Sequence, residues 1–133
     1  MNALVLDTHA TVWSLIDRAR LSAAARVAIE AATVSNASGF VPTISIVEIT
    51  YLAEKGRLPV EVKAQLLAAL DDPRSNLTAA PLDLDVASRV EHVERQQVPD
   101  MPDRVIAATA VHLGLPLVSR DGKIRASAVS TVW

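Results

Sequence analysis

The stretch LVLDTH, residues 4–9, sets the fold class, because an apolar run ends in an acid and a helical pattern follows at once. Residues 3–6 are expected to form a short strand, and residues 8–16 carry apolar side chains at helical spacing. A buried strand that feeds directly into a helix is typical of a parallel sheet with helices on both faces. The stretch therefore predicts an α/β fold.

The rest of the chain continues this alternation. Further strands are expected at 39–43, 77–82, 115–119 and 129–132, and further helices at 23–34, 46–55, 60–71, 84–97, 103–113 and after Asp121. Local signals support several ends: Ser22 can cap a helix, while Gly56 and Gly114 follow helical runs. A length of 133 residues fits a single domain spanning 1–133.

Composition favours an aliphatic core. Half of the residues are hydrophobic and only 3% are aromatic, so Val, Leu, Ile and Ala must fill the interior. The absence of cysteine excludes disulfides and thiolate metal sites. No apolar run reaches the roughly 18 residues of a membrane span, and the N-terminus lacks the pattern of a signal peptide. We expect a cytoplasmic protein that does not bind a membrane.

The net charge of −2 differs from that of constitutive nucleic-acid binders, which tend to be basic. Two basic clusters are hidden in this sum. Arg120, Lys123 and Arg125 form the first, and Arg18 and Arg20 form the second. Each cluster is either solvated surface charge or a contact to phosphates.

Four acids stand where an expected strand gives way to a helix or where a helix begins: Asp7, Glu48, Asp103 and Asp121. Because the carboxyl ends of parallel strands meet at one edge of a sheet, we expect these side chains to lie together. Crowded carboxylates repel each other and need a cation at neutral pH. Mg²⁺ or Mn²⁺ fits oxygen ligands best. A carboxylate-bound metal in an open groove suggests hydrolysis of a phosphodiester.

Each acid also has a purely structural interpretation. Asp7 and Asp121 are placed to cap the helices that follow them. Ser45 and Glu48 have the spacing of a capping box, and Asp103 lies in a first helical turn, where the helix dipole favours a carboxylate. Capping explains why an acid is tolerated at each place. It does not explain why all four fall at one edge.

Small hydroxyl residues adjoin the acids: Thr8, Thr43, Ser45 and Ser119. We interpret them as hydrogen-bonding partners that orient metal ligands. The three histidines are scattered without metal-binding spacing, and His9 is assigned to a surface or supporting position. The chain has no G-x-S-x-G elbow, P-loop or G-x-G-x-x-G motif.

The ordered set of motifs resembles the PIN domain and, more narrowly, the VapC toxins of bacterial type II toxin–antitoxin systems. The matching stretches are LVLDTHATVW, ISIVEI, DMPDRVIAATA and LVSRDGKI, which run over nearly the whole chain. This resemblance implies an α/β/α sandwich with a central, mostly parallel sheet of four to five strands. It also implies a Mg²⁺- or Mn²⁺-dependent endoribonuclease, usually dimeric and inhibited by a VapB-type antitoxin.

By motif position, the residues that match the family's catalytic and metal-binding quartet are Asp7, Glu48, Asp103 and Asp121. Asp100, one helical turn before Asp103, is an additional candidate ligand. Thr8 and Ser119 match the small hydroxyl positions beside the first and last acids, although Thr is more common than Ser at the latter. No acid of the quartet is replaced by a neutral residue.

The resemblance also implies an RNA substrate and partner proteins. Arg120, Lys123 and Arg125 are expected to neutralise phosphates at the rim of the cleft. The scarcity of aromatic residues favours RNA that is recognised by shape, such as tRNA. The apolar helices at 46–70 are the expected groove for an antitoxin helix, and a remaining apolar face is expected to form a twofold homodimer.

Other interpretations remain open. Receiver and HAD-like domains also end a first strand in Asp, but a receiver needs Asp where this chain has Glu48. A HAD-like domain needs D-x-D where the chain reads Asp7-Thr8-His9. Within the resemblance, the alternatives are a PIN-like binding module without catalysis and an RNA-processing nuclease without an antitoxin.

Overall fold

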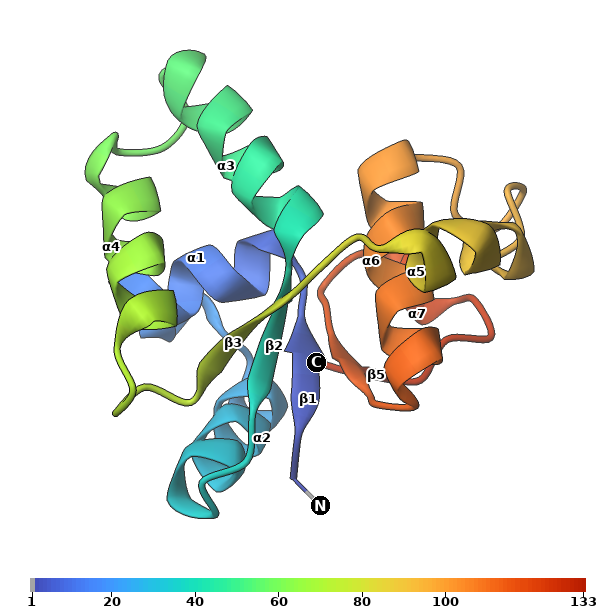
Figure 1. Ribbon diagram of the computed structural model, residues 1–133. Helices are drawn as coiled ribbons and strands as arrows, with labels where there is room; N and C mark the ends of the chain where they lie inside the picture. The colour runs from blue at the N-terminus through green and yellow to red at the C-terminus, as the bar shows by residue number, and fades with distance from the viewer. Residues whose placement is uncertain (1) are drawn as a thin grey trace.

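A computed structural model describes residues 2–133 as a parallel sheet between two layers of helices (Figure 1). The strands are β1 (Leu4–Leu6), β2 (Gly39–Pro42), β3 (Leu77–Ala80), β4 (Leu117–Val118) and β5 (Thr131–Val132). They lie in the order β3-β2-β1-β4-β5, and each neighbouring pair is parallel. The expected α/β fold with a parallel sheet is confirmed, although β3, β4 and β5 are shorter than predicted.

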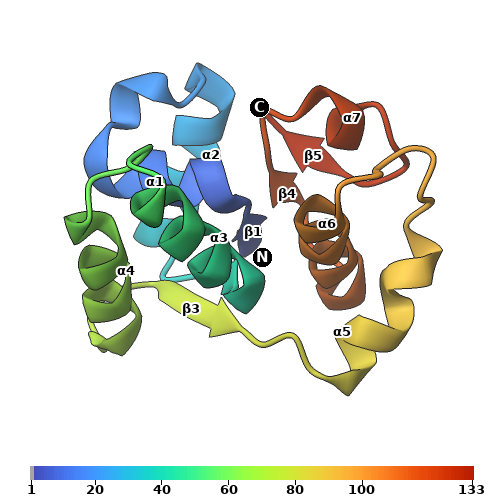
Figure 2. The ribbon, with the colours of Figure 1, turned by 90° about the horizontal axis from the view of Figure 1, so that it is seen from above.

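Helices connect the strands and cover both faces. They are α1 (Thr8–Ile16), α2 (Ala23–Val34), α3 (Thr43–Glu54), α4 (Glu61–Asp71), α5 (Leu84–Arg89), α6 (Met101–Leu113) and α7 (Gly122–Arg125), with the 3-10 turns η1 (Arg18–Arg20) and η2 (Val90–His92). Figure 2 shows α1, α2 and α4 on one side of the sheet and α5, α6 and α7 on the other. None of these helices has the length and apolarity needed to cross a lipid bilayer.

The strand β1 divides the core into two clusters. Leu4 and Leu6 pack with α1, α2 and α4, whereas Val5 packs with α5 and α6. Successive side chains of a strand point to opposite faces, so an all-apolar strand can be buried on both sides. This double burial accounts for the uninterrupted apolar run before Asp7.

The helix predicted at 84–97 ends much earlier. The helix α5 stops at Arg89, η2 continues to His92, and Arg104 Nε of α6 donates to the Val93 carbonyl at 2.7 Å. Both Val93 and Val98 are buried in the cluster around α6. Residues five positions apart lie on different sides of a helix. The chain must therefore leave the helical path to bury both valines against α6.

The helix predicted at 46–55 begins earlier, at Thr43, and Pro42 precedes it without a side-chain cap. Ser45 is consequently inside the first turn and fully buried, so the capping box considered as the structural alternative for Ser45 and Glu48 does not form. The hydroxyl of Thr43 accepts a hydrogen bond from the Leu82 N–H at 3.1 Å. Thr43 therefore ties α3 to the end of β3, and the supporting role that we expected for it beside the acids is not seen.

Two neighbouring leucines of α4 test the packing directly. Leu66 is 0% exposed within the core, whereas Leu67 is 45% exposed. Leu66→Ala should lower the free energy of unfolding by about 2–5 kcal/mol because it leaves a cavity. Leu67→Ala, the matched control, should cost less than about 1 kcal/mol. Urea unfolding followed by circular dichroism measures both, and equal losses would contradict this orientation of α4.

Candidate functional site

A cleft of about 270 Å³ opens at the carboxyl end of the sheet, the upper end in Figure 1, where β1 and β2 pass into α1 and α3. Its lining residues are Asp7, Thr8, His9, Glu48, Leu52, Asp100, Asp103, Arg120 and Asp121. The structure thus brings together the four predicted acids and the additional candidate Asp100. They come from four separate segments of the chain, which meet only because the sheet is parallel.

Asp7 and Asp121 also cap helices, as their structural interpretation predicted. Asp7 Oδ1 accepts from the Ala10 N–H at 2.8 Å. Asp121 Oδ1 accepts from the N–H groups of Lys123 and Ile124 at 3.0 and 2.9 Å. In both carboxylates the capping bonds end on Oδ1, which leaves the second oxygen outside the cap. Capping therefore fixes these side chains without consuming their capacity to bind a ligand.

Asp100 and Asp103 are positioned by the start of α6. The helix begins at Met101, two residues before the predicted start, and Pro102 is its second residue. Asp100 is the cap, and its Oδ2 accepts from the Asp103 N–H at 3.1 Å. Asp103 lies in the first turn, as expected. The cap thus holds two carboxylates one turn apart at the mouth of the cleft.

Thr8 holds Glu48 in place through a short hydrogen bond. Thr8 Oγ1 lies 2.6 Å from Glu48 Oε1 and 3.0 Å from Ser45 Oγ. A hydroxyl carries one proton, so the shorter contact to the carboxylate takes it, and Ser45 then donates to Thr8. Thr8 and Ser45 are both buried. This chain of hydroxyls joins α1 to α3 and restricts the rotamers of Glu48.

Ser119 occupies the corresponding place on β4. Its side chain is fully buried, and its Oγ accepts from the Asp121 N–H at 3.1 Å. The same side chain interacts with the carboxylate of Asp7 and opposes the rise in its pKa. Ser119 therefore links the first and last acids of the cleft.

Burial and mutual repulsion disfavour the charged forms of these acids. Asp103 has its pKa raised to about 7, first by burial and then by the charges of Asp100, Asp121, Glu48 and Asp7. Burial also raises the pKa of Asp7, and the hydrogen bonds from Ser119 and the Ala10 N–H only partly oppose it. The pKa of Glu48 is raised mainly by burial, against the bond from Thr8. A cation in the cleft would relieve this repulsion.

The donor set of the cleft suits a hard divalent ion. Its potential ligands are carboxylate oxygens, which Mg²⁺ and Mn²⁺ prefer. Across residues 2–133, no three acidic or histidine side chains are already gathered as a preformed metal site. An ion bound here would therefore draw the carboxylates inward or share them through water, as Mg²⁺ commonly does.

Of the three basic residues predicted to contact RNA, one lines the cleft and two lie outside its lining. Arg120 lines the cleft, and its guanidinium carbon lies 4.9 Å from the centre of the Trp13 ring. Lys123 and Arg125 are exposed on α7, and in the described part of the chain neither belongs to the lining. His9, which we assigned to a surface or supporting position, is exposed and does line the cleft. Its place directly after Thr8 was the only signal in the sequence.

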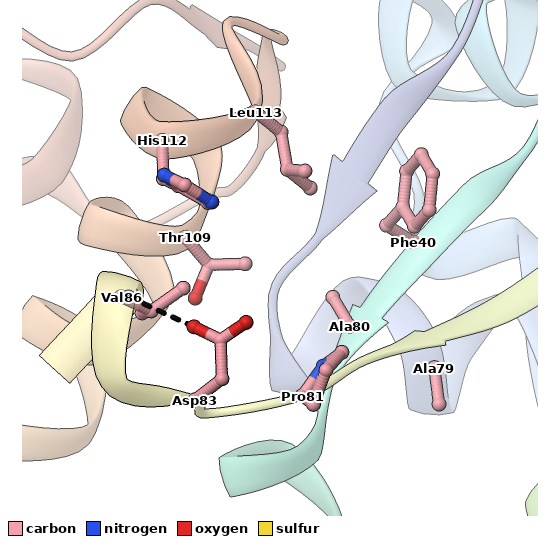
Figure 3. A pocket seen from close by; sticks show the side chains of 9 residues that line it. All are labelled: Phe40, Ala79, Ala80, Pro81, Asp83, Val86, Thr109, His112 and Leu113. Atoms are coloured by element: carbon pink, nitrogen blue, oxygen red, sulfur yellow. Dashed lines mark hydrogen bonds between the residues drawn. The ribbon is translucent and has the colours of Figure 1, made fainter.

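A smaller cavity of about 100 Å³ lies between β3, α5 and α6, away from the acids (Figure 3). Its polar groups mostly serve the fold: Asp83 caps α5 by accepting from the Val86 N–H at 3.0 Å, and Thr109 donates to the Val105 carbonyl. His112 Nδ1 is buried and has no hydrogen-bond partner within residues 2–133. None of the predicted site residues lines this cavity, so the acidic cleft remains the candidate site.

The raised pKa of Asp103 predicts how the folding stability of the metal-free protein depends on pH. In the folded protein Asp103 keeps its proton up to about pH 7, whereas the unfolded chain releases it near 3.8. The folded state therefore binds more protons between these values, and its stability must fall as pH rises through this window. Asp103→Asn should remove part of that fall. Thermal melts of both proteins in EDTA measure it, and parallel pH profiles would contradict the assignment.

Comparison with known proteins gives a consistent result. The family model of the PIN domain matches residues 4–129. Ribonuclease VapC22 of Mycobacterium tuberculosis (strain ATCC 25618 / H37Rv) is 30% identical over 125 residues, which cover 94% of this chain and 92% of the relative.

Solved structures share the fold. VapBC2 from Rickettsia felis, bound to a DNA fragment from its promoter, contains a chain with a TM-score of 0.71 and 16% identity, covering 97% of this chain and 96% of that one. A toxin–antitoxin complex from Klebsiella pneumoniae gives a TM-score of 0.64 at 24% identity, covering 98% and 96%. FitAcB from Neisseria gonorrhoeae gives 0.59 at 22% identity, covering 96% and 95%. With the family model spanning nearly the whole chain, the protein belongs to the PIN-domain family, as a VapC-like member.

Proposed function

We propose that this protein is a metal-dependent endoribonuclease of the VapC type, which hydrolyses phosphodiester bonds of RNA. The observation that carries the proposal is the convergence of Asp7, Glu48, Asp100, Asp103 and Asp121 in one cleft. The similarity to a ribonuclease of Mycobacterium tuberculosis supports RNA as the substrate. The expectation that the target is a structured RNA such as tRNA stays a prediction.

Asp7 and Asp103 are the proposed direct ligands of the ion. Asp7 is only 6% exposed and fixed by the start of α1, and Asp103 has the carboxylates of the other four acids around it. Glu48 and Asp121 would complete the site, partly through water, and Asp100 would be available at the mouth. Mg²⁺ retains several waters and takes few direct carboxylates, which suits this division. Mn²⁺ accepts the same oxygen ligands.

A bound Mg²⁺ or Mn²⁺ supplies a Lewis acid that polarises a phosphoryl oxygen and lowers the pKa of a coordinated water. The residues of the chain supply position and charge. Thr8 holds the Glu48 carboxylate through the 2.6 Å bond, and Ser119 links Asp7 to Asp121. Arg120, which lines the same cleft, would pair with a phosphate next to the one attacked. In-line attack by water would leave a 5′-phosphate and a 3′-hydroxyl.

A VapB-type antitoxin is the proposed partner. An apolar groove of about 390 Å³ between α3 and the start of α6 borders the acidic cleft and shares Glu48 and Leu52 with it. Val47, Tyr51 and Met101 line it and are 49%, 60% and 62% exposed. The antitoxin surface predicted at 46–70 spans α3 and α4. The groove is lined by the α3 part of that surface together with the start of α6. An apolar antitoxin segment would cover it, and an antitoxin Arg could then reach the carboxylates.

The predicted homodimer and the two alternative functions can each be tested. The homodimer is tested by sedimentation of the purified chain. A PIN-like binding module without catalysis, and a processing nuclease without an antitoxin, are the alternative functions. The first is separated from our proposal by RNA cleavage, and the second by whether a partner copurifies with the protein.

Asp7→Asn should abolish cleavage and leave the fold intact, because the change removes charge and preserves shape. Purified wild type should cut total RNA with Mg²⁺ or Mn²⁺ and stop in EDTA. Asp85→Asn, an exposed acid of α5 outside the cleft, is the matched control and should cut like wild type. Gel analysis and end-group labelling read the result. Equal cleavage by Asp7→Asn, or a 2′,3′-cyclic phosphate product, would contradict the proposed mechanism.

Thr8→Val tests the hydroxyl that orients Glu48. The substitution keeps the branched shape but removes the donor, so the metal concentration for half-maximal cleavage should rise by about 10–100-fold. Thr11→Val is the matched control, since the Thr11 hydroxyl bonds only to the Asp7 carbonyl within α1. Titration of Mg²⁺ in the cleavage assay measures both. An unchanged requirement in Thr8→Val would show that Glu48 does not serve the ion.

A further inference from the structure

We propose that a second groove beside the acidic cleft binds the RNA backbone next to the scissile phosphate, through Arg20, Arg57 and Arg120. This inference rests on the proposed function of the acidic cleft. It adds the direction in which the strand leaves that cleft and assigns two arginines, Arg20 and Arg57, to substrate binding.

The groove has the opposite charge to the cleft it adjoins. Arg20, Arg57, Arg120 and His9 line it together with the apolar Val12, Trp13, Leu52 and Leu58. Within the described residues, no acid belongs to this lining. The groove measures about 280 Å³, and it shares His9, Leu52 and Arg120 with the acidic cleft. The groove and the acidic cleft are therefore direct neighbours.

Trp13 holds two of the three arginines in place. The guanidinium carbons of Arg120 and Arg20 lie 4.9 and 5.8 Å from the centre of its ring. Trp13 itself is 6% exposed and packs against Trp133 at 5.8 Å between ring centres. Contact with an aromatic face attracts a guanidinium and restricts its rotation. Trp13 is thus a buried support for cations, with too little free surface to stack on a base.

Arg57 is placed by the end of α3. Gly56 adopts a left-handed conformation with φ of 71°, its N–H donates to Ala53 O at 3.0 Å, and the Arg57 N–H donates to Leu52 O at 2.8 Å. These two bonds form a Schellman motif, which turns the chain sharply after the helix. The turn brings Arg57 to the groove, beside the carbonyl end of α3, where the helix dipole favours a cation.

Arg20 is available to a new partner. Its Nε lies 3.4 Å from Asp17 Oδ2, and the two side chains are 64% and 47% exposed. An exposed ion pair of this kind contributes little, so a phosphate can replace Asp17 at small cost. Arginine binds phosphate through two parallel N–H groups, which suits a backbone contact.

The charge pattern favours RNA over an acidic protein segment. A polyanion that lies in the groove and continues into the cleft meets five carboxylates, unless a cation occupies the cleft. An RNA strand with its scissile phosphate on that cation satisfies both surfaces at once. An acidic peptide would end at the boundary and leave the cleft unused.

Binding measured without cleavage tests this assignment. The parent is the unmodified protein with CaCl₂ in place of MgCl₂, because Ca²⁺ takes the same carboxylate oxygens but activates a bound water less than Mg²⁺ does. The probe is a short, fluorescently labelled, single-stranded RNA followed by anisotropy over a series of salt concentrations. Arg57→Gln and Arg20→Gln are made in this parent. Arg26→Gln is the matched control, because Arg26 is exposed on α2 and lies in neither lining.

We expect each groove variant to bind several-fold more weakly and to reduce the slope of log K against log salt by about 0.7 for one lost phosphate contact. Arg26→Gln should match the parent. Groove variants that bind like the parent, or a parent that does not bind RNA, would overturn the proposal. So would a loss of binding to a labelled poly-glutamate peptide while RNA binding is unchanged, which would reassign the groove to a protein.

Cleavage by the unmodified protein is scored separately. If it cuts RNA with Mg²⁺ while the groove variants bind normally, only the groove assignment fails. If it cuts no RNA with any metal, the proposed function fails, whatever the groove variants bind.

Discussion

Repulsion among the carboxylates that share the cleft is the constraint on which this structure depends. The parallel sheet brings Asp7 and Asp121 to one edge, and the helices α3 and α6 add Glu48 and Asp103. Helix caps and buried hydroxyls hold these groups in place without neutralising them. Burial and neighbouring charge keep the pKa of Asp103 near 7. The fold thus maintains an arrangement of negative charge that a cation would stabilise, and this connects the architecture to the proposed chemistry.

The cleft lies between two surfaces of different character. An apolar groove with exposed Tyr51 and Met101 lies on one side, and the arginine groove supported by Trp13 lies on another. Leu52 of α3 lines the cleft and both grooves. The helix α3 is therefore the element that both the proposed substrate and the proposed antitoxin would contact. An antitoxin segment in the apolar groove would lie directly beside Glu48, close enough to interfere with the proposed metal site. It would leave the arginine groove uncovered.

The positions of the acids could be predicted from sequence because each depends on a local junction and on one rule of parallel sheets. Glu48 reached the cleft although its helix starts at Thr43, which places Glu48 in the second turn of α3. Contacts between distant residues were not visible. The helix predicted at 84–97 ends early, where Val93 and Val98 are buried against α6 and Arg104 binds the Val93 carbonyl. Lys55-Gly56 indicated a helix end, but only the fold places the following Arg57 near Arg20 and Trp13.

The measurement that tests the central claim most directly is the anomalous diffraction of Mn²⁺ in crystals of the unmodified protein. We expect a peak within bonding distance of carboxylate oxygens of Asp7 and Asp103, with Glu48 and Asp121 close enough to contact its waters. The same crystals of Asp7→Asn should lose the peak. A cleft without anomalous density at saturating Mn²⁺, or a peak that persists in Asp7→Asn, would contradict the claim that these acids form a metal site.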